Sequence, residues 1–191
     1  MADLTSLLGE LTSGDDARAE VAVAGLAAAA PEVTPRLLEL LESQDADHRW
    51  WATRSLAAID EPEARAGLVR ALADAEPSVR QCAALGLRHH PIPEAIPHLI
   101  TMMAEANCLS ARLAAEALAA LGAVAVPKLL EAATSGPSHV RIEAARALAR
   151  MEDPQAVPAL MALLDDPSAV VQYWVEEGLD RMGLGMVYFE P

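Results

Sequence analysis

The chain has 191 residues, of which 28 are acidic and 14 are Lys or Arg, so its formal net charge is −14. This balance argues against a surface that binds nucleic acids or anionic membranes, because such surfaces need clustered positive charge. The sequence contains 41 alanines and 27 leucines but only three Trp, two Tyr and one Phe, a composition that favours helices over sheets. We therefore expect a folded all-α protein.

Signals for export, membrane insertion and common enzyme chemistry are missing from the sequence. The N-terminus lacks the basic start and apolar run of a signal peptide. The longest run of small apolar residues, Val21 to Ala30, has ten residues, and a membrane-spanning helix needs about 20. Cys82 and Cys108 form no C-x-x-C motif, and no phosphate-binding glycine loop or G-x-S-x-G motif occurs. We expect a cytoplasmic protein without a cofactor and without catalytic activity.

An internal repeat organises the sequence. A leucine preceded by small residues recurs at steps of 30 or 31 residues, at Leu26, Leu56, Leu87, Leu118, Leu148 and Leu179. About ten residues after most of these leucines, a proline begins a Leu-rich stretch, at Pro35, Pro97, Pro127 and Pro158. One repeat lacks this proline and has Ala66 in the equivalent position. Because proline is tolerated only in the first turn of a helix, this fixed position predicts a fixed helix start.

Each repeat therefore predicts two short helices, an outer one followed by an inner one. Six such units give an α-solenoid of about twelve helices, which we expect to form a single domain over residues 1–182. A tail, 183–191, follows, and it either caps the last unit or is a short docking peptide. The units run over about 3–29, 34–59, 63–90, 93–121, 124–151 and 154–182.

Two segments make the repeat recognisable. Asp153 to Asp166 follows the pattern D-P-x-A-V-P-A-L-x-x-L-L-x-D, and Val140 to Leu148 follows V-R-x-x-A-A-x-A-L. The chain resembles the short HEAT-repeat family over residues 3–182, the type of repeat found in phycobilin lyase subunits, in deoxyhypusine hydroxylase and in artificial binders. The resemblance implies an α-solenoid and says little about function, because this fold serves many roles.

The resemblance also implies a polar ladder between repeats, formed by the Arg of the V-R pair. Arg49, Arg80 and Arg141 keep this residue, whereas Ala19, Ala111 and Gln172 replace it. We therefore expect a ladder that is broken at three of its six rungs.

The helical period places four positions of each inner helix on the concave side of the solenoid, at one, two, five and nine residues after the ladder position. The resemblance to artificial binders assigns the binding surface to the same positions. They are Glu20, Val21, Ala24, Ala28; Trp50, Trp51, Arg54, Ala58; Gln81, Cys82, Leu85, His89; Arg112, Leu113, Glu116, Ala120; Ile142, Glu143, Arg146, Arg150; and Tyr173, Trp174, Glu177, Arg181.

This predicted groove differs from the rest of the chain in composition. It holds four of the six aromatic residues, and its five arginines and four glutamates give a net charge of +1, which leaves −15 for all other positions. Aromatic residues beside arginines are typical of protein interfaces, and we expect at least one tryptophan to be broadly exposed. Two simpler interpretations stay open: one aromatic of each adjacent pair packs against a neighbouring helix, and the Arg and Glu residues form only a salt-bridged face.

Histidines and cysteines suggest no chemistry of their own. His89 and His90 are neighbours and so do not share a helix face, and no carboxylate or cysteine completes a metal site with them and His98. We therefore expect a pair of turn histidines and no metal, with His90 at the edge of the core. The iron-binding enzyme of the family needs His-Glu pairs, and the sequence contains none. We expect Cys82 and Cys108 to be buried or half-buried thiols.

Three functions remain as hypotheses. The first is a non-catalytic scaffold or adaptor that grips another protein or a peptide through Trp50, Trp51, Arg54, Leu85, His89, Arg112, Leu113, Glu116, Glu143, Arg146, Arg150, Tyr173, Trp174 and Glu177. The second is a phycobilin lyase or bilin-handling chaperone, in which the arginines would hold propionate groups. The third, a HEAT-like DNA glycosylase, is disfavoured because the predicted groove is nearly neutral.

Overall fold

The computed structural model describes residues 3–151 and 153–185, and all regular structure in these ranges is helical. The twelve α-helices of the described ranges are α1 (Leu4–Leu11), α2 (Asp16–Ala27), α3 (Thr34–Leu40), α4 (Ala46–Leu56), α5 (Pro62–Ala71), α6 (Pro77–His89), α7 (Ile96–Met103), α8 (Cys108–Ala120), α9 (Val126–Ser135), α10 (Ser138–Arg150), α11 (Val157–Met161) and α12 (Ala169–Arg181). Short 3-10 turns precede three outer helices: η1 (Pro93–Ala95), η2 (Gly122–Ala125) and η3 (Pro154–Ala156). The prediction of a twelve-helix repeat fold is confirmed.

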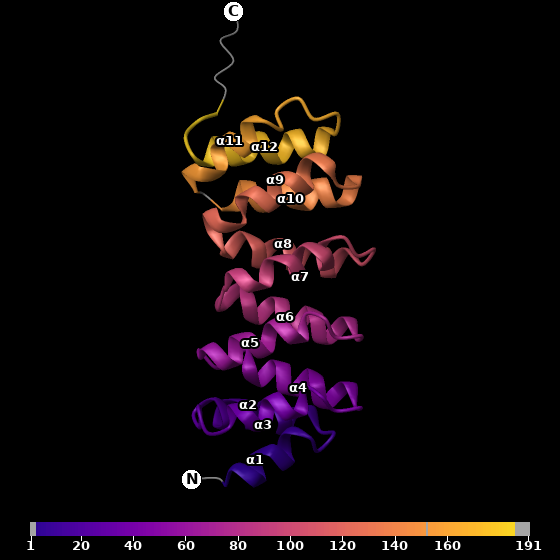
Figure 1. Ribbon diagram of the computed structural model, residues 1–191, viewed down its shortest axis with the longest axis vertical. Coiled ribbons are helices and arrows are strands. Elements are labelled where there is room, and N and C mark those ends of the chain that lie inside the picture. The colour runs from indigo at the N-terminus through magenta and orange to yellow at the C-terminus, as the bar shows by residue number, and fades with distance from the viewer. Residues whose placement is uncertain (1–2, 152, 186–191) are drawn as a thin grey trace, which may run out of the picture. The chain divides into compact units, whose positions relative to one another are not determined.

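The chain forms two compact units, one that ends at His98 and one that begins at Leu99. We call them the N-terminal unit and the C-terminal unit. Within them, outer helices lie beside the inner helices that follow, as in the pairs α1 with α2, α5 with α6 and α9 with α10 (Figure 1). Successive inner helices also pack together: α2 with α4 and α4 with α6 in the first unit, and α8 with α10 and α10 with α12 in the second. The count of one domain over residues 1–182 stays a prediction.

Small side chains let the inner helices approach closely. The alanines three residues after each ladder position, and Val175 in the last repeat, are all at most 1% exposed, and the repeated leucines are at most 2% exposed. Gly178 of α12 lies so close to α10 that a Cβ atom there would be 2.7 Å from the Cα of Ala149. The core is therefore built from near contacts between helix backbones, with one leucine filling the gap in each repeat.

Local sequence signals start and end the helices as expected. Proline occupies one of the first two positions of α3 and α9, and the side chains of Asp15, Asp45 and Asn107 accept hydrogen bonds from backbone N–H groups in the first turns of α2, α4 and α8. In the repeat that has Ala66 in place of the proline, the outer helix α5 starts at Pro62, four residues before Ala66. Gly183, at φ +73°, ends α12, and the N–H of Leu184 donates to the carbonyl of Leu179 at 2.8 Å.

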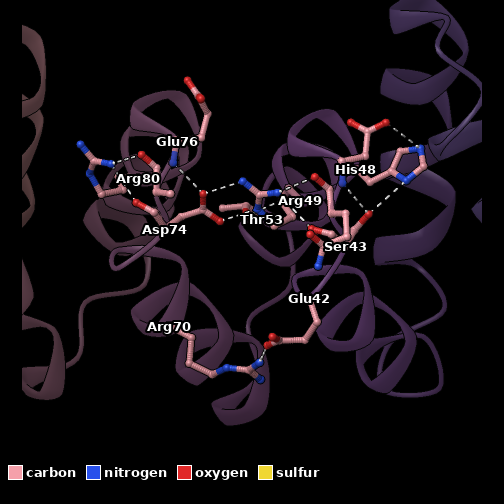
Figure 2. A network of polar contacts seen from close by, with 12 residues as sticks. Glu42, Ser43, His48, Arg49, Thr53, Arg70, Asp74, Glu76 and Arg80 are labelled. Atoms are coloured by element: carbon pink, nitrogen blue, oxygen red, sulfur yellow. Dashed lines mark hydrogen bonds and ion pairs between the residues drawn. The ribbon is translucent and has the colours of Figure 1, made fainter.

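The implied polar ladder is present where its arginine is kept in α4 and α10. Figure 2 shows the first rung, in which Arg49 donates from Nε and Nη2 to the two carboxylate oxygens of Asp74, at 2.7 and 2.9 Å. Arg49 also donates to the carbonyl of Ser43 at 3.0 Å. In the C-terminal unit, Arg141 binds Asp166 at 3.2 Å. In both rungs the carboxylate follows its arginine by 25 residues, so each rung ties one repeat to the next.

The first rung is largely buried and shifts the pKa of both partners. The side chains of Arg49 and Asp74 are 16% and 10% exposed. The hydrogen bond to Asp74 raises the pKa of Arg49. Burial raises the pKa of Asp74, but the hydrogen bonds from Arg49 and from the N–H of Glu76 outweigh it, so the pKa of Asp74 is lowered. The pair is therefore held in its charged form.

Candidate functional site

The inner-helix surface of the N-terminal unit is mainly apolar. Val21 is 77% exposed and Leu85 is 42% exposed, and the predicted positions Ala24, Ala28, Ala58 and His89 are exposed as well.

One ion pair crosses this surface. Arg54 of α4 donates to Glu20 of α2 at 2.6 Å, and both side chains remain more than a third exposed, at 36% and 52%. Cys82 lies beneath, 7% exposed, and burial raises the pKa of its thiol to about 12. Cys82 is therefore an inert part of the core, as expected, rather than a nucleophile.

The tryptophan pair of α4 divides between surface and core. Trp50 is half-buried, whereas Trp51 is only 8% exposed, and the two rings meet edge to face with centroids 4.8 Å apart. The prediction that Trp51 lies on the accessible surface is wrong, because adjacent residues on a helix point about 100° apart and the second one turns into the core. Trp174, like Trp50, is half-buried and not exposed. The expectation of a broadly exposed tryptophan is therefore wrong.

The C-terminal unit places three arginines around one carboxylate. Arg112 and Glu116 come from α8, and Glu143, Arg146 and Arg150 come from α10; we call these five residues the arginine cluster. Glu116 Oε1 accepts from Arg112 Nε at 3.4 Å, from Arg146 Nη2 at 3.3 Å and from Arg150 Nη1 at 3.5 Å. Glu143 binds Arg146 from the same helix at 3.0 Å. The interpretation of a salt-bridged face therefore holds for this part of the predicted site.

Arg146 lies at the base of the cluster and not on its surface. It is 7% exposed, and its guanidinium carbon lies 5.6 Å from the ring centroid of Trp174, a cation–π contact. Burial lowers the pKa of Arg146, and the charges of Arg112 and Arg150 act in the same direction, against Glu143 and Glu116. The prediction that Arg146 is directly accessible is wrong, because Trp174 and the glutamates cover it.

Aromatic side chains continue the cluster onto α12. Tyr173 is 55% exposed and meets Trp174 edge to face with ring centroids 5.2 Å apart. One turn further along, Arg181 donates to Glu177 at 2.7 Å. Leu113 of α8 is half-buried. Predicted residues from three inner helices are thus brought together in this unit, and Tyr173 is the exposed member of its aromatic pair.

His90 follows the end of α6 and lies next to an acidic residue. His90 Nδ1 lies 3.3 Å from Asp60, and its side chain is 21% exposed, in agreement with a place at the edge of the core. Within residues 3–151 and 153–185, no three His, Cys, Asp or Glu side chains gather closely enough to hold a metal ion. Cys108 is exposed, so the expectation of a buried or half-buried thiol is wrong for this residue. Cys108 is the first residue of α8, and the side chain at this end of the helix is not packed into the core.

Two structural features were not predicted from the sequence. The carboxylates of the ladder, Asp74 and Asp166, were not singled out, although their constant offset from Arg49 and Arg141 is a usable signal. A depression of about 600 Å³ between α5 and the segment before α7 was also missed. It is lined by Pro62, Arg65, Ala66, Val69, Pro91, Ile92, Pro93 and Glu94.

Comparison with known proteins identifies the family. The model of HEAT repeats matches the chain in three overlapping segments, residues 4–88, 34–119 and 96–180. The chain therefore belongs to the HEAT-repeat family. No curated protein sequence matches it significantly. In the described part of the chain, no helix is both long enough and apolar enough to cross a membrane.

Solved structures share the fold at low sequence identity. An archaeal HEAT-like repeats protein from Thermococcus onnurineus NA1 is 12% identical, with a TM-score of 0.64 over 100% of this chain and 84% of that one. The complex of CpcE and CpcF of phycocyanin lyase from Nostoc sp. PCC7120 is 21% identical, with a TM-score of 0.58 over 96% of this chain and 78% of that one. A designed armadillo repeat protein in complex with the peptide (KR)4 is 18% identical, with a TM-score of 0.51 over 95% and 100%. These similarities establish the fold alone.

Proposed function

We propose that the protein is a non-catalytic scaffold or adaptor that binds another protein or a peptide through the inner-helix surfaces of its two units. The observation that carries this proposal is the arginine cluster with Tyr173 and Trp174 beside it, assembled from three successive inner helices. Arginine and aromatic residues dominate the binding energy of most protein interfaces. The designed armadillo repeat protein, whose structure is a complex with the peptide (KR)4, gives a precedent for the fold in this role.

The exposure of these side chains suits recognition of a partner. Tyr173 and Leu85 are exposed, while Trp50 is half-buried, so each offers apolar area to a ligand. Their anchoring partners, such as Trp51 beneath Trp50 and Trp174 beside Tyr173, hold the rings in place. A surface that is already ordered loses little conformational entropy on binding, which favours affinity.

A comparative pull-down tests the proposal. Wild-type protein, the variant Trp50→Ala/Leu85→Ala/Tyr173→Ala and the control Arg36→Ala/Glu39→Ala are tagged, checked for equal helicity by circular dichroism and exposed to source-cell extract. The control removes an exposed ion pair of α3, whose atoms lie 3.0 Å apart. We expect a protein that the wild type and the control capture and the triple variant loses, and whose purified form binds the wild type directly. Equal capture by all three would refute the role of the inner-helix surfaces.

A second candidate is a bilin-handling role. The specific observation in its favour is the convergence of Arg112, Arg146 and Arg150 next to Trp174, since guanidinium groups match the propionate carboxylates of a tetrapyrrole. The fold is shared with the phycocyanin lyase subunits. Titration with an open-chain tetrapyrrole, followed by its absorbance spectrum, separates the two: a saturable spectral shift that Arg112→Ala/Arg150→Ala abolishes supports this role, and an unchanged spectrum removes it.

A further inference from the structure

We propose that the arginine cluster of the C-terminal unit is a carboxylate-binding site, so that the segment recognised there is an acidic peptide with an apolar side chain next to its acidic residue. This inference rests on the proposed function and names the chemistry of its partner.

The three guanidinium groups share one acceptor atom at long distances. Their contacts to Glu116 Oε1 measure 3.3, 3.4 and 3.5 Å, whereas a charge-assisted N–H···O bond is typically about 2.7 to about 2.9 Å. Elsewhere in the same molecule, Arg49 reaches Asp74 at 2.7 and 2.9 Å. Glu116 therefore attracts all three arginines without satisfying any of them as fully as the ladder carboxylate satisfies Arg49.

Donors outnumber acceptors within the cluster. Each guanidinium carries five N–H donors, and a carboxylate offers roughly four lone-pair sites, so two glutamates cannot pair with three arginines completely. The side chains of Arg112 and Arg150 are 54% and 40% exposed, and their remaining donors are accessible from outside. A carboxylate that arrives between them adds acceptors at the place where the cluster lacks them.

The electrostatic setting favours an acidic ligand at this site and disfavours it elsewhere. The cluster contains three arginines and two glutamates, a net charge of +1 on a chain of net charge −14. Burial reduces solvent screening at Arg146, which is 7% exposed. An acidic segment is therefore repelled by most of the protein surface and attracted here, which fixes where it binds.

The aromatic pair defines the neighbouring part of the ligand. Trp174 contacts Arg146 and is covered in part by Tyr173, whose ring is 55% exposed. An apolar side chain of the ligand, next to its acidic residue, would pack on Tyr173. Recognition thus combines a charge contact with a hydrophobic one, and a ligand that carries only one of the two would bind more weakly.

Fluorescence anisotropy with a defined probe tests the proposal. The probe is the dye-labelled peptide Glu-Leu-Glu-Phe-Glu-Leu-Glu, and its counterpart replaces every Glu with Lys. We expect the wild type to bind the acidic peptide and not the basic one, and Arg112→Ala/Arg150→Ala to weaken binding about tenfold or more. The matched control Arg36→Ala/Arg70→Ala removes the same charge from exposed positions of the N-terminal unit and should change affinity less than about twofold.

A third variant separates a binding site from a structural ion-pair network. Glu116→Gln keeps the shape of the side chain but removes the built-in charge that competes with the ligand, so we expect acidic-peptide affinity to rise about threefold or more. Equal binding by the wild type and Arg112→Ala/Arg150→Ala, or a loss of affinity in a folded Glu116→Gln, would overturn the proposal. The proposed function fails on a different measurement, the loss of a captured protein when Trp50, Leu85 and Tyr173 are replaced and the arginines are left in place.

Discussion

The Arg49–Asp74 rung should be a large single contribution to the stability of the N-terminal unit. Asp74 accepts two hydrogen bonds from Arg49 and one from the N–H of Glu76 at 2.8 Å, and both side chains are largely buried. Hydrogen bonds to charged groups contribute about 1.5 to about 3 kcal/mol, and loss of one partner leaves the other charge desolvated. We therefore expect Asp74→Ala to lower the free energy of unfolding by about 3 kcal/mol, and Arg49→Ala by a similar amount.

A double-mutant cycle measures the interaction itself. Urea unfolding of the wild type, Arg49→Ala, Asp74→Ala and the double variant, followed by far-UV circular dichroism, should give a coupling free energy of about 2 kcal/mol. The exposed pair Arg36 and Glu39, whose side chains are 66% and 65% exposed, serves as the reference and should couple by less than about 0.5 kcal/mol. A coupling at Arg49–Asp74 as small as this reference would refute the reasoning.

The same rung gives a defined pH dependence. The pKa of Asp74 is lowered in the folded protein, so the unfolded chain binds a proton at a higher pH than the folded one. The stabilisation is complete above the unfolded value, about 3.9, and is lost as the pH falls through the lower folded pKa. Asp74→Asn should therefore be less stable than the wild type near neutral pH, and the difference should shrink as the pH falls below about 4. A difference that stays constant with pH would show that the charge of Asp74 is not involved.

Further predictions concern packing and reactivity. Gly178→Ala should destabilise the C-terminal unit by about 1 to about 3 kcal/mol in urea unfolding, because its Cβ would lie 2.7 Å from the backbone of α10. By contrast Gly9→Ala, where nothing lies within 4 Å of the new Cβ, should stabilise α1 by about 0.5 to about 1 kcal/mol; a loss of stability there would contradict the geometry. Leu148→Ala removes a fully buried side chain and should cost about 2 to about 5 kcal/mol, measured as a lower urea midpoint. Iodoacetamide at mildly alkaline pH should label exposed Cys108 and leave Cys82 unmodified until urea unfolds the protein, as read by peptide mass spectrometry, because burial holds the pKa of Cys82 at about 12.

The sequence predicts the fold well because the spacing of the repeated residues follows directly from how they pack. A leucine or alanine that must fill the same space in every repeat recurs at the same spacing, and the buried residues Leu56 and Ala52 follow this rule. Pro127 marks the start of α9, because proline is tolerated in the first turn of a helix and not further in. The division near His98 could not be predicted, because it depends on contacts between repeats that no single repeat motif records.

The candidate site could be predicted only in outline. The helical period assigns Arg112, Arg150 and Tyr173 to one surface, and the structure exposes all three. The period cannot tell that Trp174 covers Arg146, or that Trp51 turns into the core, because exposure depends on the size of the side chains on the next helix. For the same reason the sequence predicts Arg and Glu residues on this surface but not that three arginines gather around Glu116.

The alanine-rich core has a consequence for motion and for recognition. Alanine has no rotatable side-chain torsion to fix, so ordering Ala52, Ala114 or Ala144 on folding costs no side-chain entropy. Neighbouring inner helices consequently have few alternative ways to repack, and each unit should respond to a ligand as a stiff body. The conformational entropy lost on binding then comes mainly from the long exposed side chains, above all those of Arg112 and Arg150. The affinity for a partner should therefore depend on how far these few side chains must be ordered.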